Sequence, residues 1–431
     1  MKMTDKKTVR EPLFHISKRA DMPLGKAVLI RASAIVIGLL LCSVVCSIIF
    51  GANPFAVIAE LFGGNFGSSR RLWILLRDMA LLLGVGLALL PAFKMKFWNL
   101  GGNGQILIGT LAAIACMFYM GGKVADGVII LCMIVSSIVA GAIWAVIPAV
   151  FKAFFRTNES LFTLMMNYIA TGLVGFFINE WVKTGSGVLT PIKYGNLPDI
   201  GNAYLLSIIV IAVITAIMFA YMKYSKHGFE VAVVGESENT ARYVGINVKK
   251  VVIRTMAVSG AICGVVGLLL AGSIHHTISE TSANNMGFTA IMVAWLAKFN
   301  PLMMILTAFF ITFLSKGMGQ VQTKFGITND AVSDVIIGLI YFCVIGCEFF
   351  ISYKVKFRKG KKAEKAAADF MADAEENRAE YSSESNSEGE GKNGKKVADD
   401  NSAAPASGEN QEKKLKSSRA RAKKSAKKGD E

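Results

Sequence analysis

The sequence predicts an all-α membrane protein, a polytopic bundle of about ten transmembrane helices with broken or re-entrant segments. More than half of the 431 residues (53%) are hydrophobic. They form unbroken runs, such as 32–50, 128–150 and 207–222, that approach the ~20 helical residues needed to cross a hydrocarbon core. None of these runs alternates as a barrel strand does, and only helices and closed barrels satisfy their backbone in lipid. A helical bundle follows.

The apolar runs place the predicted spans along the chain in order. They are 27–50, 72–93, 104–120, 125–149, 160–181, 203–222, 255–273, 286–299, 302–318 and 331–352. Lys298, Asn300 and Pro301 interrupt the apolar sequence between the eighth and ninth spans. Two spans are counted there because ten crossings put every basic segment on one side, which the positive-inside rule makes cytoplasmic. Nine crossings would leave the basic C-terminal segment outside.

Three parts of the chain differ in composition. The cytoplasmic N-terminal segment is 1–26, the membrane domain is 27–352, and the basic cytoplasmic tail is 353–431. The tail has almost no bulky apolar residues, so it cannot bury enough surface to offset its ordering entropy, and we expect disorder. The net charge of +16 resides mainly at membrane edges and in this tail. It therefore predicts contact with anionic membrane lipid rather than nucleic acid. The alternative for the last residues is a contact with RNA.

Two polar, glycine-rich or amide-rich stretches interrupt the apolar pattern. The first is 97–105, with the sequence FWNLGGNGQ, and the second is 284–287 together with the break at 298–301. Non-helical backbone at membrane depth is tolerated where it is buried in protein or lines a wet cavity. Paired interruptions in the two halves of a transporter mark a substrate path. The alternative is an ordinary turn at the membrane edge in each place.

The longest polar loop between spans, 223–254, contains a helix signal. Ser237 is a good N-cap, Glu238 and Arg242 suit the two ends of a helix dipole, and Gly245 can close the helix in a left-handed conformation. A helix of about two turns is predicted, on the basic side of the membrane. It would serve as a contact for a soluble partner. A turn lying on the membrane surface is the alternative.

Several other features point away from catalysis by this chain. The sequence has no G-x-x-x-x-G-K-[ST] motif, so the chain is not expected to bind ATP itself. The seven cysteines all fall in predicted spans, where small apolar packing explains them better than metal or redox chemistry. His275 and His276, with Glu280 nearby, are too few for a metal site. Arg77 and Asp78 are adjacent, and either a role in translocation or a local salt bridge explains them.

Four segments, in order, resemble one family of membrane proteins. They are FWNLGGNGQILIG, ESLFTLMMNYIA, GFEVAVVGESENTARYVGINVKK and MGFTAIMVAWLAKFNPL, between 97 and 302. They are similar to segments of the permeases of ABC importers for branched-chain amino acids, ribose and nucleosides. A further stretch between Trp181 and Pro198 makes the chain most similar to the larger permease of the simple-sugar and nucleoside branch. The chain departs from the family pattern at Asn103 (usually Glu), Met166 (usually Leu) and Ser237 (commonly Asn).

The resemblance implies a function and a set of partners. The chain would be a permease in a bacterial plasma membrane, passing a nucleoside or simple sugar delivered by an external binding lipoprotein. A separate cytoplasmic ATPase would bind ATP and Mg and drive transport. A second permease would complete the pair, either a second copy of this chain or, as the resemblance to the larger of two distinct permeases favours, a different chain. A branched-chain amino acid permease is the nearest alternative. An ion-coupled secondary carrier is disfavoured by the few intramembrane ionisable residues, and a non-transporting scaffold would leave the interruptions unexplained.

Within this interpretation, neutral polar and aromatic residues are candidates for the substrate pathway. They can bind a neutral solute without the cost of desolvating a charge, or they can hydrogen-bond neighbouring helices instead. The pathway candidates are Trp98, Asn99, Asn103, Gln105, Asn167, Tyr168 and Trp295. The candidates for coupling to the ATPase are Gly235, Glu236, Glu238, Ala241, Arg242, Gly245 and Ile246. Ala241 and Gly245 have little side-chain bulk, so the helix is expected to fit into a groove on the ATPase.

Overall fold

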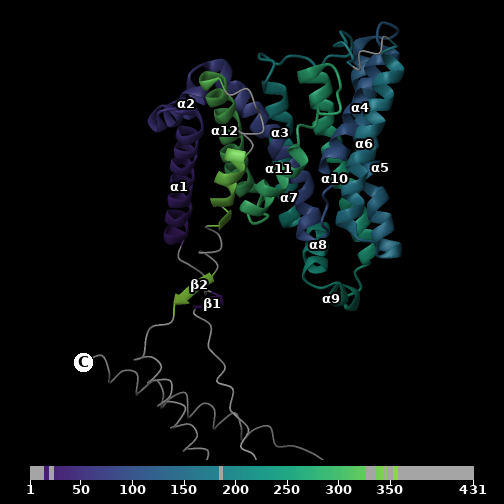
Figure 1. Ribbon diagram of the computed structural model, residues 1–431. Helices are drawn as coiled ribbons and strands as arrows, with labels where there is room; N and C mark the ends of the chain where they lie inside the picture. The colour runs from purple at the N-terminus through teal and green to yellow at the C-terminus, as the bar shows by residue number, and fades with distance from the viewer. Residues whose placement is uncertain are drawn as a thin grey trace, which may run out of the picture. The chain divides into compact units, whose positions relative to one another are not determined.

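The computed structural model describes residues 14–18, 24–183, 188–326, 335–343, 345–346 and 353–357 (Figure 1). The chain divides into two units, of which Ile16–Val355 contains all the described helices. Two five-residue strands, β1 (Phe14–Lys18) and β2 (Tyr353–Phe357), form a two-stranded sheet that the sequence did not predict. The remainder of the predicted tail, from 358 onward, lies outside the described residues.

Helices make up the rest of the named elements. They are α1 (Leu24–Phe50), α2 (Pro54–Phe66), α3 (Ser69–Lys94), α4 (Gly102–Met120), α5 (Asp126–Phe155), α6 (Glu159–Trp181), α7 (Leu205–Tyr224), α8 (Lys226–Glu236), α9 (Glu238–Tyr243), α10 (Val248–Leu269), the π-helix η1 (Leu270–His275), α11 (Met286–Leu296) and α12 (Pro301–Phe325). Residues 335–343 and 345–346 are also helical.

Seven helices in the described part of the chain are long and apolar enough to cross a membrane. They are α3, α4, α5, α6, α7, α10 with η1, and α12, and each coincides with one predicted span. The first predicted span falls on the 27-residue α1, and the eighth falls on the 11-residue α11. The tenth is described only in part. The all-α membrane class fits, and the count of ten remains a prediction.

Two triplets of helices share one pattern. In α3–α4–α5 and in α10–α11–α12, a long helix is followed by an irregular stretch, a shorter helix and a second long helix. The triplets interlock, because α10 packs on α4 and α5 while α3 packs on α11 and α12. The first helices, α3 and α10, also pack on each other. The irregular stretches of both triplets, 95–101 and 276–285, are thereby held inside the same bundle.

Small residues allow a close contact between α5 and α10. A methyl group on Gly141 would lie 2.3 Å from the carbonyl oxygen of Gly260, and one on Gly264 would lie 2.2 Å from that of Ser137. Helices in lipid gain from such close approach because apolar burial alone does not favour protein over lipid. The α5–α10 contact is therefore a fixed part of the bundle against which the first turn of α6 and the 95–101 stretch can be positioned.

Two helices in the described ranges were not predicted from the sequence. In α2, the side chain of Asn53 accepts a hydrogen bond from the Phe55 N–H, and Pro54 occupies the first turn. In α8, the Ser225 hydroxyl accepts from the Gly228 N–H. Both are short helices next to longer apolar runs. The α2 helix packs on α1 and α12, whereas α8 joins α7 to α9 at one end of the bundle (Figure 1).

Candidate functional site

The helices α4 and α11 begin beside one another in the bundle. The Gly287 N–H donates to Asn103 Oδ1 at 2.7 Å, and Asn103 Nδ2 donates to Asn285 Oδ1 at 3.5 Å. The approach is close, since a methyl group on Gly287 would lie 2.4 Å from the Asn103 backbone nitrogen. We call Asn103, Asn285 and Gly287 the helix-start junction. It joins the two interruptions that the sequence placed 182 residues apart.

Asn167 of α6 supplies hydrogen bonds to the irregular backbone that precedes α4. Its Oδ1 accepts from the Gly104 N–H at 2.8 Å, and its Nδ2 donates to the Leu100 carbonyl oxygen at 2.9 Å. The side chain is buried, so both backbone groups depend on it rather than on water. Asn167 therefore fixes the position of the first turn of α4 relative to α6.

A cavity of about 340 Å³ lies at this junction. Three predicted pathway residues line it: Asn103, Asn167 and Tyr168. The other lining residues are Leu107, Leu164, Thr171, Glu280, Thr281, Ala283, Asn284, Asn285 and Phe288. Amides, hydroxyls and one tyrosine ring face the space, with Glu280 as its carboxylate. We call this the amide cavity. Its neutral donors and acceptors suit a polar, uncharged solute.

Asn99 and Gln105 do not line the amide cavity. Asn99 is fully buried, and its Nδ2 donates to the Ser259 hydroxyl of α10 at 3.3 Å. Its Oδ1 accepts from the Gly101 N–H at 3.0 Å and from Gln105 Nε2 at 3.3 Å. These two amides bind α10 and their own stretch of chain, which is the helix-packing role that the sequence left as the alternative.

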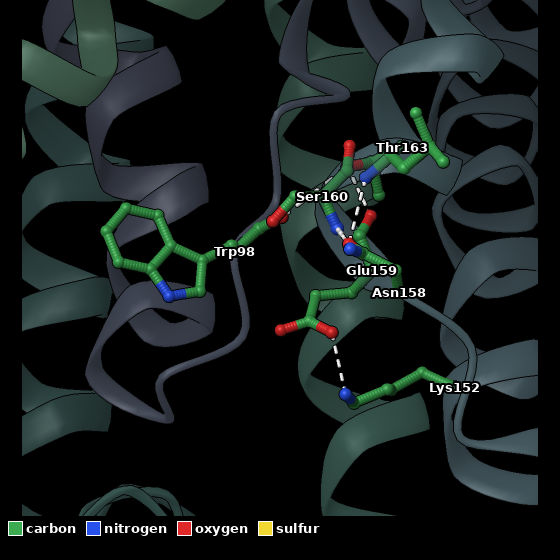
Figure 2. A network of polar contacts seen from close by, with 7 residues as sticks. Trp98, Lys152, Asn158, Glu159, Ser160 and Thr163 are labelled. Carbon is green, nitrogen blue, oxygen red and sulfur yellow. Dashed lines mark hydrogen bonds and ion pairs between the residues drawn. The ribbon is translucent and has the colours of Figure 1, made fainter.

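Trp98 and Trp295 belong to an aromatic cluster that is separate from the lining of the amide cavity. Their ring centroids are 5.3 Å apart, and Phe93 and Phe299 extend the cluster with centroid distances of 5.9 Å (to Trp98) and 6.2 Å (between the phenylalanines). Both tryptophans are exposed. Figure 2 shows the Trp98 ring directed away from the first turn of α6.

The first turn of α6 ties the 95–101 stretch to the end of α5 (Figure 2). Lys152 Nζ of α5 lies 2.6 Å from Glu159 Oε2. The Thr163 hydroxyl accepts from the Leu100 N–H at 3.1 Å and lies 3.5 Å from the Trp98 carbonyl oxygen, to which it can donate. Asn158 caps the helix by accepting from two backbone N–H groups. The backbone next to Trp98 is thus fixed to α6.

The predicted short helix of the polar loop is α9. The Ser237 hydroxyl accepts from the Thr240 N–H at 3.3 Å, and Gly245 follows the helix with φ of +81°. Glu238 and Arg242 form an exposed pair at 3.5 Å. Gly235, at the end of α8, packs on the end of α3, because a methyl group there would lie 2.0 Å from the Lys94 carbonyl oxygen.

The side chain of Ala241 lies on the opposite face of α9 from the one we expected. It is fully buried in the protein, so its small size serves internal packing and is not presented to a partner. Tyr243 and Val244 are 92% and 65% exposed, and the sequence interpretation had not singled them out. A tyrosine among exposed residues of a short helix was the available signal. Glu236 is exposed, and Ile246 is half-buried against the core.

Arg77 and Asp78 form the local salt bridge that was one of the two sequence alternatives, with a distance of 2.8 Å. Asp78 also pairs with Lys316 of α12 at 2.5 Å, and the Arg77 guanidinium lies 5.4 Å from the Tyr204 ring centroid. These contacts brace α3 against α12. In the described part of the chain, no group of three or more His, Cys, Asp or Glu residues is arranged to hold a metal ion.

Comparison with known proteins assigns the chain to a family. The family of branched-chain amino acid transport system permease components matches residues 72–345, well over half of the chain. Among the relatives, the guanosine ABC transporter permease protein NupP of Bacillus subtilis is 27% identical over 352 residues, covering 79% of this chain and 97% of NupP.

Two further relatives extend the comparison to other transported solutes. The nucleoside ABC transporter permease protein NupB of Lactococcus lactis is 27% identical over 349 residues, 76% of this chain and 92% of NupB. The glucose ABC transporter permease protein TsgB13 of Haloferax volcanii is 26% identical over 332 residues, 73% of this chain and 85% of TsgB13. The chain is therefore a member of the branched-chain amino acid transport system permease component family, a transporter subunit and not an enzyme.

Proposed function

We propose that this permease passes a nucleoside or a simple sugar through the membrane as part of an ABC importer. The observation that carries the proposal is the amide cavity at the helix-start junction, where Asn103, Asn167 and Tyr168 meet. Nucleosides and sugars are uncharged and rich in hydroxyl groups, so amides and hydroxyls can replace their water without an ionic partner. The names of the relatives, which include guanosine, nucleoside and glucose permeases, support the same solutes.

The proposed topology has ten spans, with both termini in the cytoplasm of a bacterium and the bundle in its plasma membrane. The seven long apolar helices support a multi-pass protein. The basic segments 94–96, 152–156 and 223–254 support the orientation, because Lys and Arg favour the cytoplasmic side. In this arrangement α8 and α9 lie in the cytoplasm, and the 188–204 stretch faces outside.

The proposed partners follow from the family. A cytoplasmic ATPase that binds ATP and Mg would contact α9, and an external binding lipoprotein would deliver the solute. A second permease, a different chain, would cover Tyr168, which is exposed and lines the amide cavity. Exposed aromatic side chains next to a polar cavity support a covered interface better than a lipid-facing surface, since lipid offers the cavity's amides no hydrogen bonds.

Solute uptake by cells that lack this gene tests the proposal. Labelled uridine, adenosine, ribose and leucine are compared in parallel, with the plasmid-borne gene restoring function as the control. We expect loss of nucleoside or ribose uptake and unchanged leucine uptake. Loss of leucine uptake alone would assign the chain to amino acid transport instead. Unchanged uptake of all four solutes would contradict the proposed substrates.

A further inference from the structure

A second cavity, of about 450 Å³, lies between the α8–α9 segment and the helices next to it. The ends of α3 and α5, the start of α6 and the start of α10 form its other walls. Its lining includes five cationic side chains, Lys96, Lys152, Arg156, Arg242 and Lys249, and three carboxylates, Glu159, Glu236 and Glu238. We call it the basic cavity. It is distinct from the amide cavity, with which it shares no residue.

The carboxylates of the basic cavity neutralise only part of its positive charge. Lys152 pairs with Glu159 at 2.6 Å, and Arg242 pairs weakly with Glu238 at 3.5 Å. Within the described ranges, Lys96 and Arg156 have no carboxylate at ion-pair distance. Lys249 lies over the Phe154 ring, 4.5 Å from its centroid, and among the described residues no carboxylate pairs with it. An anionic group in the cavity would therefore find cations that no internal acid has paired.

Lys96 and Arg156 occupy backbone positions that disfavour any residue with a Cβ atom. Their φ angles are +60° and +55°, in the left-handed region where glycine is favoured and other residues are strained by about 1 kcal/mol or more. Cations near the ends of α3 and α5 do offset the partial negative charge of the helix carbonyls. That effect does not require an open space between the cations and α9, which the cavity provides.

The position of the basic cavity beside α9 favours a side chain of a partner protein as its ligand. The residues 237–239 and Arg242 line it from the α9 side, and Tyr243 of the same helix is exposed. A partner bound on α9 would reach the mouth of the cavity. We propose that the basic cavity receives an acidic side chain, Asp or Glu, of the partner ATPase, held by Lys96 and Arg156. This inference rests on the proposed function, in which α9 contacts that ATPase.

An acidic group held there would contact the chain next to the aromatic cluster. Lys96 lies two residues before Trp98, and Met95 and Phe97 line the basic cavity with it. Gly235 of α8 is packed on the Lys94 carbonyl, so α8 and this stretch have little room to move independently. The bound carboxylate would thus connect the ATPase to the 95–101 stretch through one side chain, in addition to any contact through α9.

The test compares two double variants of the permease in the assembled transporter in nanodiscs. Lys96→Gln/Arg156→Gln removes the unpaired cations, and Lys223→Gln/Lys250→Gln removes two exposed cations outside the cavity. The dissociation constant of the complex between ATPase and permease is measured from about 50 to about 500 mM NaCl, a range over which electrostatic screening goes from weak to strong. We expect the cavity variant to weaken binding by about tenfold or more at low salt and to flatten the salt dependence, with little change in the control.

Two further arms make the result specific. The comparison is repeated in nanodiscs of neutral phosphatidylcholine alone and with phosphatidylglycerol added. The proposal predicts the same difference in both, whereas a difference that requires phosphatidylglycerol would assign the cavity to a lipid headgroup and overturn it. Equal dissociation constants for the cavity variant and its control would also overturn it. Tyr243→Ala tests the contact between α9 and the ATPase separately, so the proposed contact and the proposed role of the cavity can be refuted independently.

Discussion

Asn167 replaces helical hydrogen bonds that the chain lacks before α4. Asn167→Leu would leave the Gly104 N–H and the Leu100 carbonyl without their partner in a buried place, at a cost of about 1–3 kcal/mol each. We expect a lower melting temperature of the purified permease and reduced uptake. Asn167→Asp keeps the acceptor but loses the donor, so its melting temperature and uptake should fall between those of the wild type and of Asn167→Leu. A leucine variant as stable as the wild type would contradict this role.

Gly287 is required by the close approach of α11 to α4. Gly287→Val would push side-chain atoms against the Asn103 backbone nitrogen and side-chain oxygen, and overpacking of this kind costs about 1–3 kcal/mol. The matched control is Gly319→Val on α12, where a methyl group meets nothing within 4 Å. We expect a loss of thermal stability and transport for the first variant only. Similar melting curves for both variants would show that the junction tolerates bulk.

Single residues mark the limit of what the sequence could predict about the site. Three of the predicted pathway residues, Asn103, Asn167 and Tyr168, line the amide cavity. Asn99 instead donates to Ser259 of α10, and Gln105 donates to Asn99. All are amides or aromatics in polar interruptions, and their composition does not reveal which side of the chain faces the cavity. Thr171 and Glu280 also line it, although a lone threonine within an apolar helix and a carboxylate in a loop gave no specific signal.

At the scale of elements, α9 presents Tyr243 rather than Ala241. Tyr243→Ala is expected to leave the protein inserted but to lower ATP-driven uptake at least about tenfold, because aromatic residues often dominate protein interfaces. Tyr224→Ala, at another exposed tyrosine, is the control. ATPase activity and uptake are measured on the same preparation. Unchanged uptake per ATP hydrolysed would argue against α9 as the coupling contact.

A further variant, Ala241→Arg, tests the burial of Ala241 within the protein rather than a contact with a partner. Ala241 is fully buried, so an arginine there must displace core side chains or expose the loop. A loss of coupling in that variant would reflect disruption of α9 packing. Gly245→Val acts similarly, because its φ of +81° disfavours a β-branched residue. For both variants we expect reduced yield or stability in a thermal melt, and wild-type stability would contradict the buried placement.

The ion pair between Glu230 of α8 and Arg254 of α10 makes the stability of this end of the bundle depend on pH. Arg254, 2.7 Å away, and His227 hold the pKa of Glu230 below its ordinary value of 4.5. The stabilisation is therefore complete above pH ~4.5 and is lost as the pH falls through the lowered pKa. We expect Glu230→Gln to melt below the wild type at neutral pH, with the difference shrinking in acid. A difference that is constant with pH would contradict the ionic contribution.

The elements that the sequence predicted are those with long apolar runs. The bounds of α3, α5, α6 and α7 follow such runs closely, since transfer to lipid depends on composition more than on packing. The strands β1 and β2 and the helices α2 and α8 were missed. Asn53–Pro54 and Ser225 were signals for the two helices, but short elements at the ends of a bundle depend on tertiary contacts as much as on local sequence.

At the scale of the whole bundle, two interlocked triplets bring both interruptions to one place. The packing of α10 on α5 and of α3 on α12 brings the starts of α4 and α11 together. The sequence indicated the two interruptions, whereas their contact is a property of the assembled bundle. Tyr168, which lines the amide cavity, is exposed, which is why a second permease is part of the proposal.

The most direct test of this account asks whether solute passes through the amide cavity. Thr171→Cys places a small thiol on its lining, and Lys193→Cys places one on the exposed 188–204 stretch. Cells expressing each variant are treated with a charged, membrane-impermeant thiosulfonate, and labelled uridine uptake is measured, with wild-type cells giving the background. The account predicts that modification blocks uptake only in Thr171→Cys and that excess uridine slows the block. Modification of Thr171→Cys that leaves uptake unchanged would contradict it.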